Sequence, residues 1–261
     1  MKKTIKISTI GVLAFTCLVS VQGAAAPTSD GSVLPLPEPV PASVTGKTLK
    51  GSKAGTQELT SAEAKRPNIL LVMVDDMGWT DVGSFGSEID TPNIDALAKQ
   101  SVKCTDFHVS VACSPTRSML LSGTDNHIAG IGNMREILAP EQRGKPGYEG
   151  HLNDRVVSLP EVLRTGGYHT YMAGKWHLGH EPESFPHARG FEQSFSMLFG
   201  GSSYWSDMFG LLAENEEIAE YVMNEKRLKE LPKDFYSTRS YTDFLIESIR
   251  KNQGDGKPFL A

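Results

Sequence analysis

The sequence predicts an α/β fold, in which helices flank a mostly parallel sheet, for the chain from residue 66 onward. The first observation is a continuous apolar run of strand length at residues 68–74. Its lack of polar alternation is typical of a strand that is buried on both faces of a parallel sheet. The second observation is that helix signals and further strand-like segments alternate downstream of this run, which favours an α/β architecture.

The first two helices that we expect are marked by a proline near their starts. A Thr-Pro pair supplies an N-cap and a first helical residue for a helix over residues 91–102. A Ser-Pro pair opens a second helix over residues 114–122, which a glycine follows.

The remaining elements follow the same alternation. A capping box, Ser-Leu-Pro-Glu, begins a helix over residues 158–165 that ends at a Gly-Gly pair. A strand is expected over residues 168–173, a capped helix over residues 240–250, and the start of another strand over residues 257–261.

Composition excludes several classes of protein. The 261 residues are 39% hydrophobic and 22% charged, so a wholly disordered chain is not expected. The formal charge is −5 and no basic patch stands out, so we expect no nucleic-acid partner. Beyond the N-terminus there is no apolar run long enough for a stable membrane span. Three cysteines are too few for a disulfide-stapled scaffold.

The first 25 residues read as a secretory signal peptide. Three lysines form a basic start, an apolar stretch follows, and small residues up to Ala25 supply a cleavage site. The alternative is an uncleaved membrane anchor, for which the apolar stretch is short. We therefore expect an exported bacterial protein, periplasmic or secreted.

Residues 26–65 are expected to form a disordered linker rich in Pro, Gly and Ser. Such a composition buries too little apolar surface to offset the entropy of ordering the chain. The folded part is therefore expected to be residues 66–261.

A pair of carboxylates ends the apolar run at residues 68–74. Asp75 and Asp76 fall at the carboxyl end of this expected strand, where the reactive groups of open α/β sheets gather. Adjacent carboxylates repel each other unless a cation neutralises them, and hard oxygen ligands suit Ca²⁺ or Mg²⁺. The alternative is a helix cap or a solvated turn.

A second candidate is Cys113, placed just before the expected helix at 114–122. The positive end of a helix stabilises an anion or a nucleophile, and Arg117 lies one turn later and can reach back to the same point. Two alternatives remain open from the residues alone. Cys113 could form a disulfide with Cys104 in an oxidising compartment, or it could be a buried thiol.

A third candidate follows the expected strand at 168–173. If strand geometry persists, Lys175 and His177 lie on one side of the chain and Trp176 on the other. A cation and an imidazole pointing together can bind an oxyanion. The alternative is a solvated Lys175 and a hydrogen-bonded structural His177. The other histidines show no spacing that suggests a zinc site, and we take them as surface or structural residues.

Taken together, these segments resemble signatures of the sulfatase family, most closely those of bacterial arylsulfatases. Cys113, Pro115 and Arg117 match the pattern Cys-x-Pro-x-Arg. The resemblance is dense from residue 66 to about residue 199 and implies an alkaline-phosphatase-like sandwich. The other matching segments are Pro-Asn-Ile-Leu at 67–70, Asp-Asp-Met-Gly at 75–78, Thr-Pro-Asn-Ile-Asp at 91–95, Asp-Asn-His-Ile-Ala-Gly-Ile-Gly at 125–132, Gly-Lys-Trp-His-Leu-Gly at 174–179 and His-Ala-Arg-Gly-Phe at 187–191.

The resemblance implies a cation and a modified nucleophile. Asp75 and Asp76 would bind a divalent cation, Ca²⁺ in this branch with Mg²⁺ as the alternative. A maturation enzyme would convert Cys113 to Cα-formylglycine, whose gem-diol would be a further cation ligand and would attack sulfur. The second hydroxyl of the diol then provides a route to expel sulfate, which an ordinary serine ester lacks.

The resemblance also assigns roles to the neighbouring side chains. Arg117 would bind a hydroxyl of the diol, Lys175 would hold the sulfate, and His177 would contact the formylglycine and assist collapse of the covalent intermediate. The substrate would be a small-molecule or carbohydrate sulfate ester.

One departure from the family pattern concerns length. Members of the family are longer, and their second halves supply more cation ligands, a further histidine and a further lysine. We therefore expect an N-terminal fragment, truncated before the second half, whose own activity is in doubt. Two other readings stay open: a non-catalytic sulfatase-like protein, and a phosphonate or phosphate monoester hydrolase of the same superfamily.

Overall fold

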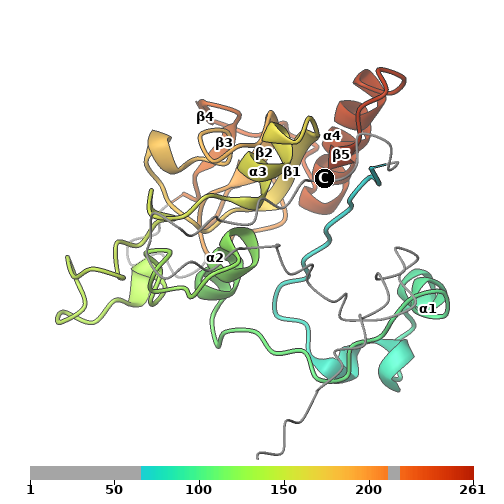
Figure 1. Ribbon diagram of the computed structural model, residues 1–261, viewed down its shortest axis with the longest axis horizontal. Coiled ribbons are helices and arrows are strands. Elements are labelled where there is room, and N and C mark those ends of the chain that lie inside the picture. The colour runs from blue at the N-terminus through green and yellow to red at the C-terminus, as the bar shows by residue number, and fades with distance from the viewer. Residues whose placement is uncertain (1–65, 211–217) are drawn as a thin grey trace, which may run out of the picture. The chain divides into compact units, whose positions relative to one another are not determined.

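The computed structural model describes residues 66–210 and 218–261 (Figure 1). The expected signal peptide at 1–25 and linker at 26–65 lie outside the described residues. In the part of the chain that is described, no helix is both long and apolar enough to cross a membrane.

A five-stranded sheet with the strand order β4-β3-β2-β1-β5 forms the centre of the described part. β1 (His169–Lys175) lies between β2 (Gln193–Met197) and β5 (Phe259–Leu260), and both pairings are parallel. β3 (Tyr221–Met223) and β4 (Lys226–Leu228) extend the sheet as antiparallel strands beside β2. The α/β class and the strands expected at 168–173 and 257–261 are confirmed, and the antiparallel pairs make this sheet mixed.

The antiparallel hairpin depends on a tight turn. Met223 pairs with Lys226, so only two residues connect the strands, and the first of them, Asn224, has a φ of 55°. Asn tolerates this left-handed conformation better than most residues with a side chain. Asn224 also ties the turn to β2, because its Oδ1 accepts a 2.7 Å hydrogen bond from the backbone N–H of Ser194.

The described residues contain four α-helices. They are α1 (Pro92–Ala98), α2 (Cys113–Ser122), α3 (Leu159–Thr165) and α4 (Ser237–Lys251), and α3 and α4 both contact β1. The remaining helices are single 3₁₀ turns: η2 (Trp79–Asp81), η3 (Gly83–Phe85), η4 (Arg135–Ile137) and η5 (Pro182–Ser184).

The capping box predicted for the third helix is confirmed. Ser158 Oγ accepts a hydrogen bond from the backbone N–H of Glu161, and Glu161 Oε2 accepts one of 2.6 Å from the backbone N–H of Ser158. The Thr-Pro start of α1 differs in one respect. Pro92 is the first helical residue, but Thr91 makes no side-chain cap and instead donates to Asp95 Oδ1 at 3.0 Å.

Two other helix boundaries differ from the prediction. α4 begins at Ser237, three residues before the expected Ser240, and α1 ends at Ala98 rather than near residue 102. Helix ends depend on caps and tertiary contacts that periodicity does not report, so shifts of this size are ordinary.

Among residues 66–210 and 218–261, two apolar clusters pack against the sheet. One contains Trp176 and Leu178, which follow β1, together with Leu198, which follows β2. The other surrounds the aromatic rings of Phe195 and Tyr221. The first cluster packs next to the carboxyl end of β1, where Lys175 and His177 lie.

The expectation that residues 68–74 form a strand buried on both faces is wrong. The run lies beside β5, and backbone N–H groups of Ile69 and Leu71 donate to the carbonyls of Phe259 and Ala261 at 2.7 and 2.8 Å. Leu70 and Val72 are 67% and 71% exposed. The described residues supply a hydrogen-bonding neighbour along one edge of this run only, so its other edge and much of its side-chain surface stay open.

Candidate active site

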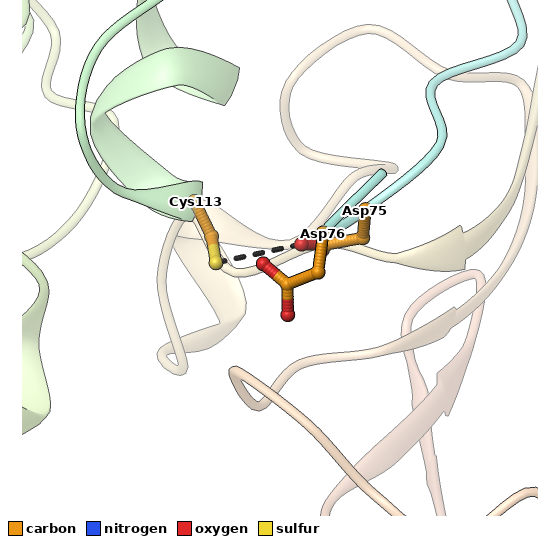
Figure 2. A group of neighbouring side chains, drawn as sticks. All are labelled: Asp75, Asp76 and Cys113. Carbon is orange, nitrogen blue, oxygen red and sulfur yellow. Dashed lines mark hydrogen bonds between the residues drawn. The ribbon is translucent and has the colours of Figure 1, made fainter. Parts of the chain in front are cut away.

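The carboxyl end of this extended run carries Asp75 and Asp76. Asp76 has a φ of 54°, a left-handed conformation that Asp adopts more readily than most other residues with a side chain. One ligand atom from each of Asp75, Asp76 and Cys113 lies within 4.8 Å of the others, and Figure 2 shows the three side chains converging. The Cys113 Sγ lies 3.5 Å from Asp75 Oδ1 and donates a hydrogen bond to it.

Cys113 is the first residue of α2, so the helix begins one residue earlier than expected, and Ala112 is the N-cap. The alanine side chain cannot cap the backbone N–H groups of the first turn, so their partial positive charge stays available at Cys113. Within the described residues both Cys104 and Cys113 are free, and the alternative of a disulfide between them is not formed.

Two cationic side chains meet the Asp75 carboxylate. Lys175 Nζ lies 2.7 Å from Asp75 Oδ2, and Arg117 Nη2 donates to the same oxygen at 2.8 Å. The side chains of Lys175 and Arg117 are only 13% and 12% exposed, so the alternative of a solvated lysine is wrong. Burial favours the neutral acid of Asp75, but hydrogen bonds and charge from Lys175 and Arg117 outweigh it and lower the pKa of its carboxyl group.

Arg117 also joins α2 to the end of β1. Its Nη1 donates a 2.7 Å hydrogen bond to the backbone carbonyl of Lys175. One guanidinium therefore holds the helix that carries Cys113, the strand that carries Lys175 and the run that carries Asp75 in a fixed relation.

His177 is not in contact with this group. The strand geometry ends after Lys175, because His177 has a φ of 58°, and the expected alternation does not persist. The His177 side chain is 3% exposed, and its Nε2 lies 2.8 Å from Glu136 Oε1. This contact matches the alternative of a hydrogen-bonded histidine.

Glu136 was not predicted as a site residue. It lies in the single turn η4, 41 residues before His177, in a segment without helix or strand periodicity. Burial disfavours its charge, but the hydrogen bond and charge of His177 outweigh that cost and lower the pKa of Glu136 to about 2. No sequence signal marks this residue, because its partner is set by the tertiary fold.

The arginine of the segment at 187–191, which resembles a sulfatase signature, lies away from the candidate site. Arg189 is 4% exposed, and its guanidinium donates to the backbone carbonyls of Leu152, Asn153 and Val156 at 2.8–3.0 Å. This arginine holds a loop next to α3 and has no contact with the Asp75, Asp76 and Cys113 cluster.

The three clustered side chains fit a divalent cation in part. Two carboxylates are hard oxygen ligands of the kind that Ca²⁺ and Mg²⁺ prefer, whereas a thiol is a softer ligand that suits neither. If residue 113 carried oxygen in place of sulfur, all three ligands would be the hard oxygen atoms that Ca²⁺ and Mg²⁺ prefer.

The sequence pattern of one protein family, Sulfatase, matches residues 67–261. An uncharacterised sulfatase of Schizosaccharomyces pombe is 49% identical over 209 residues, which cover 77% of this chain and 37% of that protein. An arylsulfatase of Klebsiella aerogenes is 40% identical over 181 residues, which cover 69% of this chain and 38% of that protein. This chain thus matches well under half the length of either relative.

Solved structures also match this chain over less than half of their own length. The crystal structure of Ps i-CgsB superposes with a TM-score of 0.61 at 31% identity, over 74% of this chain and 43% of that chain. The same protein was also crystallised in complex with k-i-k-neocarrahexaose, and that structure has a TM-score of 0.61 at 28% identity.

Proposed function

Since the chain belongs to the sulfatase family, we propose that it carries the nucleophile, the cation ligands and the sulfate-binding side chains of a sulfate ester hydrolase. The observation that carries this proposal is the cluster of Asp75, Asp76 and Cys113 at the start of α2, with Lys175 and Arg117 beside it. The proposed substrate class is a small-molecule or carbohydrate sulfate ester. The arylsulfatase relative supports the first type, and the carbohydrate complex of Ps i-CgsB supports the second.

The proposed nucleophile derives from Cys113. A maturation enzyme converts its side chain to the aldehyde of Cα-formylglycine. As a hydrate, this aldehyde would supply one hydroxyl that attacks sulfur as the S–O bond to the alcohol breaks and the alcohol leaves. Deprotonation of the second hydroxyl would then expel sulfate and regenerate the aldehyde. The uncapped first turn of α2 supports this role, because its free N–H groups stabilise negative charge at position 113.

Asp75, Asp76 and the modified residue 113 are the proposed holders of a divalent cation, Ca²⁺ with Mg²⁺ as the alternative. When bound, the cation supplies positive charge that neutralises the sulfuryl oxygens. Asp75 is already paired with Lys175 and Arg117, so a cation shares this carboxylate with them. The cation and the two side chains thus form one positively charged surface for an anionic substrate.

Lys175 and Arg117 have distinct proposed tasks. Lys175 ends in a mobile point charge with three donors and is the proposed sulfate ligand. Arg117 is held by two hydrogen bonds, one to Asp75 and one to the Lys175 carbonyl, and is the proposed partner of the hydrated aldehyde. His177 is the proposed proton-transfer group, which assists departure of sulfate from residue 113.

The proposed location of the protein rests on the N-terminal sequence. We propose that residues 1–25 direct export and that the mature protein acts in the periplasm or outside the cell. Export also provides access to sulfate esters that do not enter the cell.

Mass spectrometry tests the nucleophile. The full chain is co-expressed with a formylglycine-generating enzyme, and the peptide that contains residue 113 is analysed after digestion. The expected result is loss of the thiol and gain of an aldehyde, which an aldehyde-specific hydrazine probe traps. Cys104→Ala is the matched control and should leave conversion unchanged, whereas an unmodified Cys113 in the wild-type chain contradicts the proposal.

A further inference from the structure

The contact between His177 and Glu136 has the features of an oriented imidazole rather than of a simple core residue. The two side chains come from different segments, η4 and the loop after β1, and meet at 2.8 Å. The His177 side chain is 3% exposed and that of Glu136 is 24% exposed, so the contact is largely shielded from water. Shielding strengthens a charged hydrogen bond and makes the geometry specific.

His177 and Glu136 each have one further polar side-chain atom that makes no hydrogen bond with the described residues. Among the described residues, neither His177 Nδ1 nor Glu136 Oε2 has a hydrogen-bond partner, although both atoms are buried. Buried polar atoms are nearly always paired in folded proteins. An unpaired ring nitrogen on a well-fixed imidazole is therefore the expected feature of a group that meets a ligand.

The surrounding backbone is adapted to this contact. His177 has a left-handed φ of 58°, a strained conformation for a residue with a side chain, and such strain gathers at functional sites. Gly200, just after β2, leaves the room that the ring needs. A Cβ atom there would lie 2.9 Å from His177 Cε1 and 3.2 Å from Glu136 Oε1.

We propose that Glu136 is a positioning residue, which keeps a proton on His177 Nε2 and leaves Nδ1 as the ring atom that meets the reacting group. The inference rests on the proposed function for the role of His177 in proton transfer. An ionised carboxylate accepts hydrogen bonds and cannot donate one, so the ring nitrogen that faces it must carry a hydrogen. Which nitrogen of a histidine is protonated is set by the hydrogen bond that the other nitrogen makes or lacks.

The negative charge of Glu136 keeps the hydrogen on His177 Nε2 at pH values near neutrality. Its lowered pKa of about 2 keeps the carboxylate ionised at any pH near neutrality. His180 is the other charged group that acts on Glu136, and Arg135 and Glu220 in turn act on His180. Because Glu136 accepts from His177 throughout this range, any proton that His177 exchanges passes through Nδ1.

Nitrogen NMR of the imidazole rings tests the inference in the full 261-residue chain. Two-bond ¹⁵N–¹H correlations separate protonated from bare ring nitrogens, and His177→Gln identifies the signals of His177. We expect the neutral ring of His177 to carry its hydrogen on Nε2 and to leave Nδ1 bare. A wild-type ring that deprotonates at Nε2 and keeps a proton on Nδ1 would overturn the inference.

Glu136→Gln supplies the second comparison. The amide has the same shape but donates as well as accepts, so it no longer dictates which nitrogen is protonated. We expect a mixed population with a proton on either nitrogen, and a ring pattern identical to that of the wild type would also overturn the inference. Glu141→Gln is the matched control, because Glu141 is an exposed glutamate a few residues along the same loop. The ring pattern is independent of Cys113 conversion, so failure of the proposed function is detected separately by mass spectrometry.

Discussion

Replacing Asp75 or Asp76 by asparagine tests whether the two carboxylates have different roles. We expect the Asp75 carboxylate to stabilise the fold and the Asp76 carboxylate to act only in cation binding. Asp75 neutralises Lys175 and Arg117, whereas in the described residues Asp76 is exposed and takes part in no ion pair. Asp75→Asn leaves two largely buried cations side by side without a counter-charge. Asp76→Asn removes one of two adjacent carboxylates and relieves their repulsion.

The size of the effect follows from burial. Removing one partner of a buried ion pair costs about 3–5 kcal/mol, and an exposed pair is worth under about 1 kcal/mol. The Asp75 side chain is 30% exposed, between these limits. We expect Asp75→Asn to lower the free energy of unfolding by about 2 kcal/mol, or the melting temperature by about 4–8 °C. For Asp76→Asn we expect no loss.

The assay is thermal unfolding followed by circular dichroism, first with EDTA and then with excess calcium. Without calcium only Asp75→Asn should melt early, and with calcium both variants should lack the stabilisation that the wild type gains. Asp90→Asn, at an exposed carboxylate 15 residues further along the chain from Asp75, is the matched control. Equal melting temperatures for Asp75→Asn and wild type in EDTA would refute the reasoning about charge pairing.

Two further predictions concern residues outside the site. His169 lies between Glu192 and Asp255 at 2.7 and 2.6 Å; burial opposes its charge, but these carboxylates outweigh it and raise the pKa of the imidazole. Its stabilising contribution should be complete below the ordinary histidine pKa and be lost as the pH rises through the raised value. His169→Gln should flatten that part of the curve of melting temperature against pH, and an unchanged slope would count against the contact. Arg189→Leu leaves three backbone carbonyls without their hydrogen-bond donor, and each unpaired carbonyl costs about 1–3 kcal/mol of folding free energy. The urea concentration at the unfolding midpoint should therefore fall strongly. A decrease in the free energy of unfolding of under about 1 kcal/mol would show that water replaces the guanidinium.

The local motifs could be predicted from the sequence because their signals are local. The capping box of α3 and the strand β1 depend on residues within a few positions of each other, and both are present. The positions of Asp75 after an extended run and of Cys113 at a helix start marked each as a candidate, and only the resemblance to the sulfatase family implied that they share one site. Their side chains do meet.

The strands β2, β3 and β4 could not be predicted in the same way. β2 contains two serines, Ser194 and Ser196, that are fully buried, and this polar composition hides a core strand. β3 and β4 are three residues each, too short for a periodic pattern. Their existence depends on a turn at Asn224 and on pairing with β2.

The remaining differences arise from long-range contacts. Glu136 faces His177 across 41 residues of sequence, and no spacing rule connects them. The apolar run at 68–74 has the composition of a central strand, but burial of its side chains requires elements packed on both faces, and Leu70 and Val72 stay 67% and 71% exposed.

Calcium titration of the chain with and without conversion of Cys113 tests the central claim most directly, namely that Asp75, Asp76 and residue 113 form one cation site. Isothermal titration calorimetry of the converted chain should give one calcium per chain, weaker binding in the unconverted chain, and no binding in Asp76→Asn. Calcium binding of equal strength in the converted chain, the unconverted chain and Asp76→Asn would contradict the account.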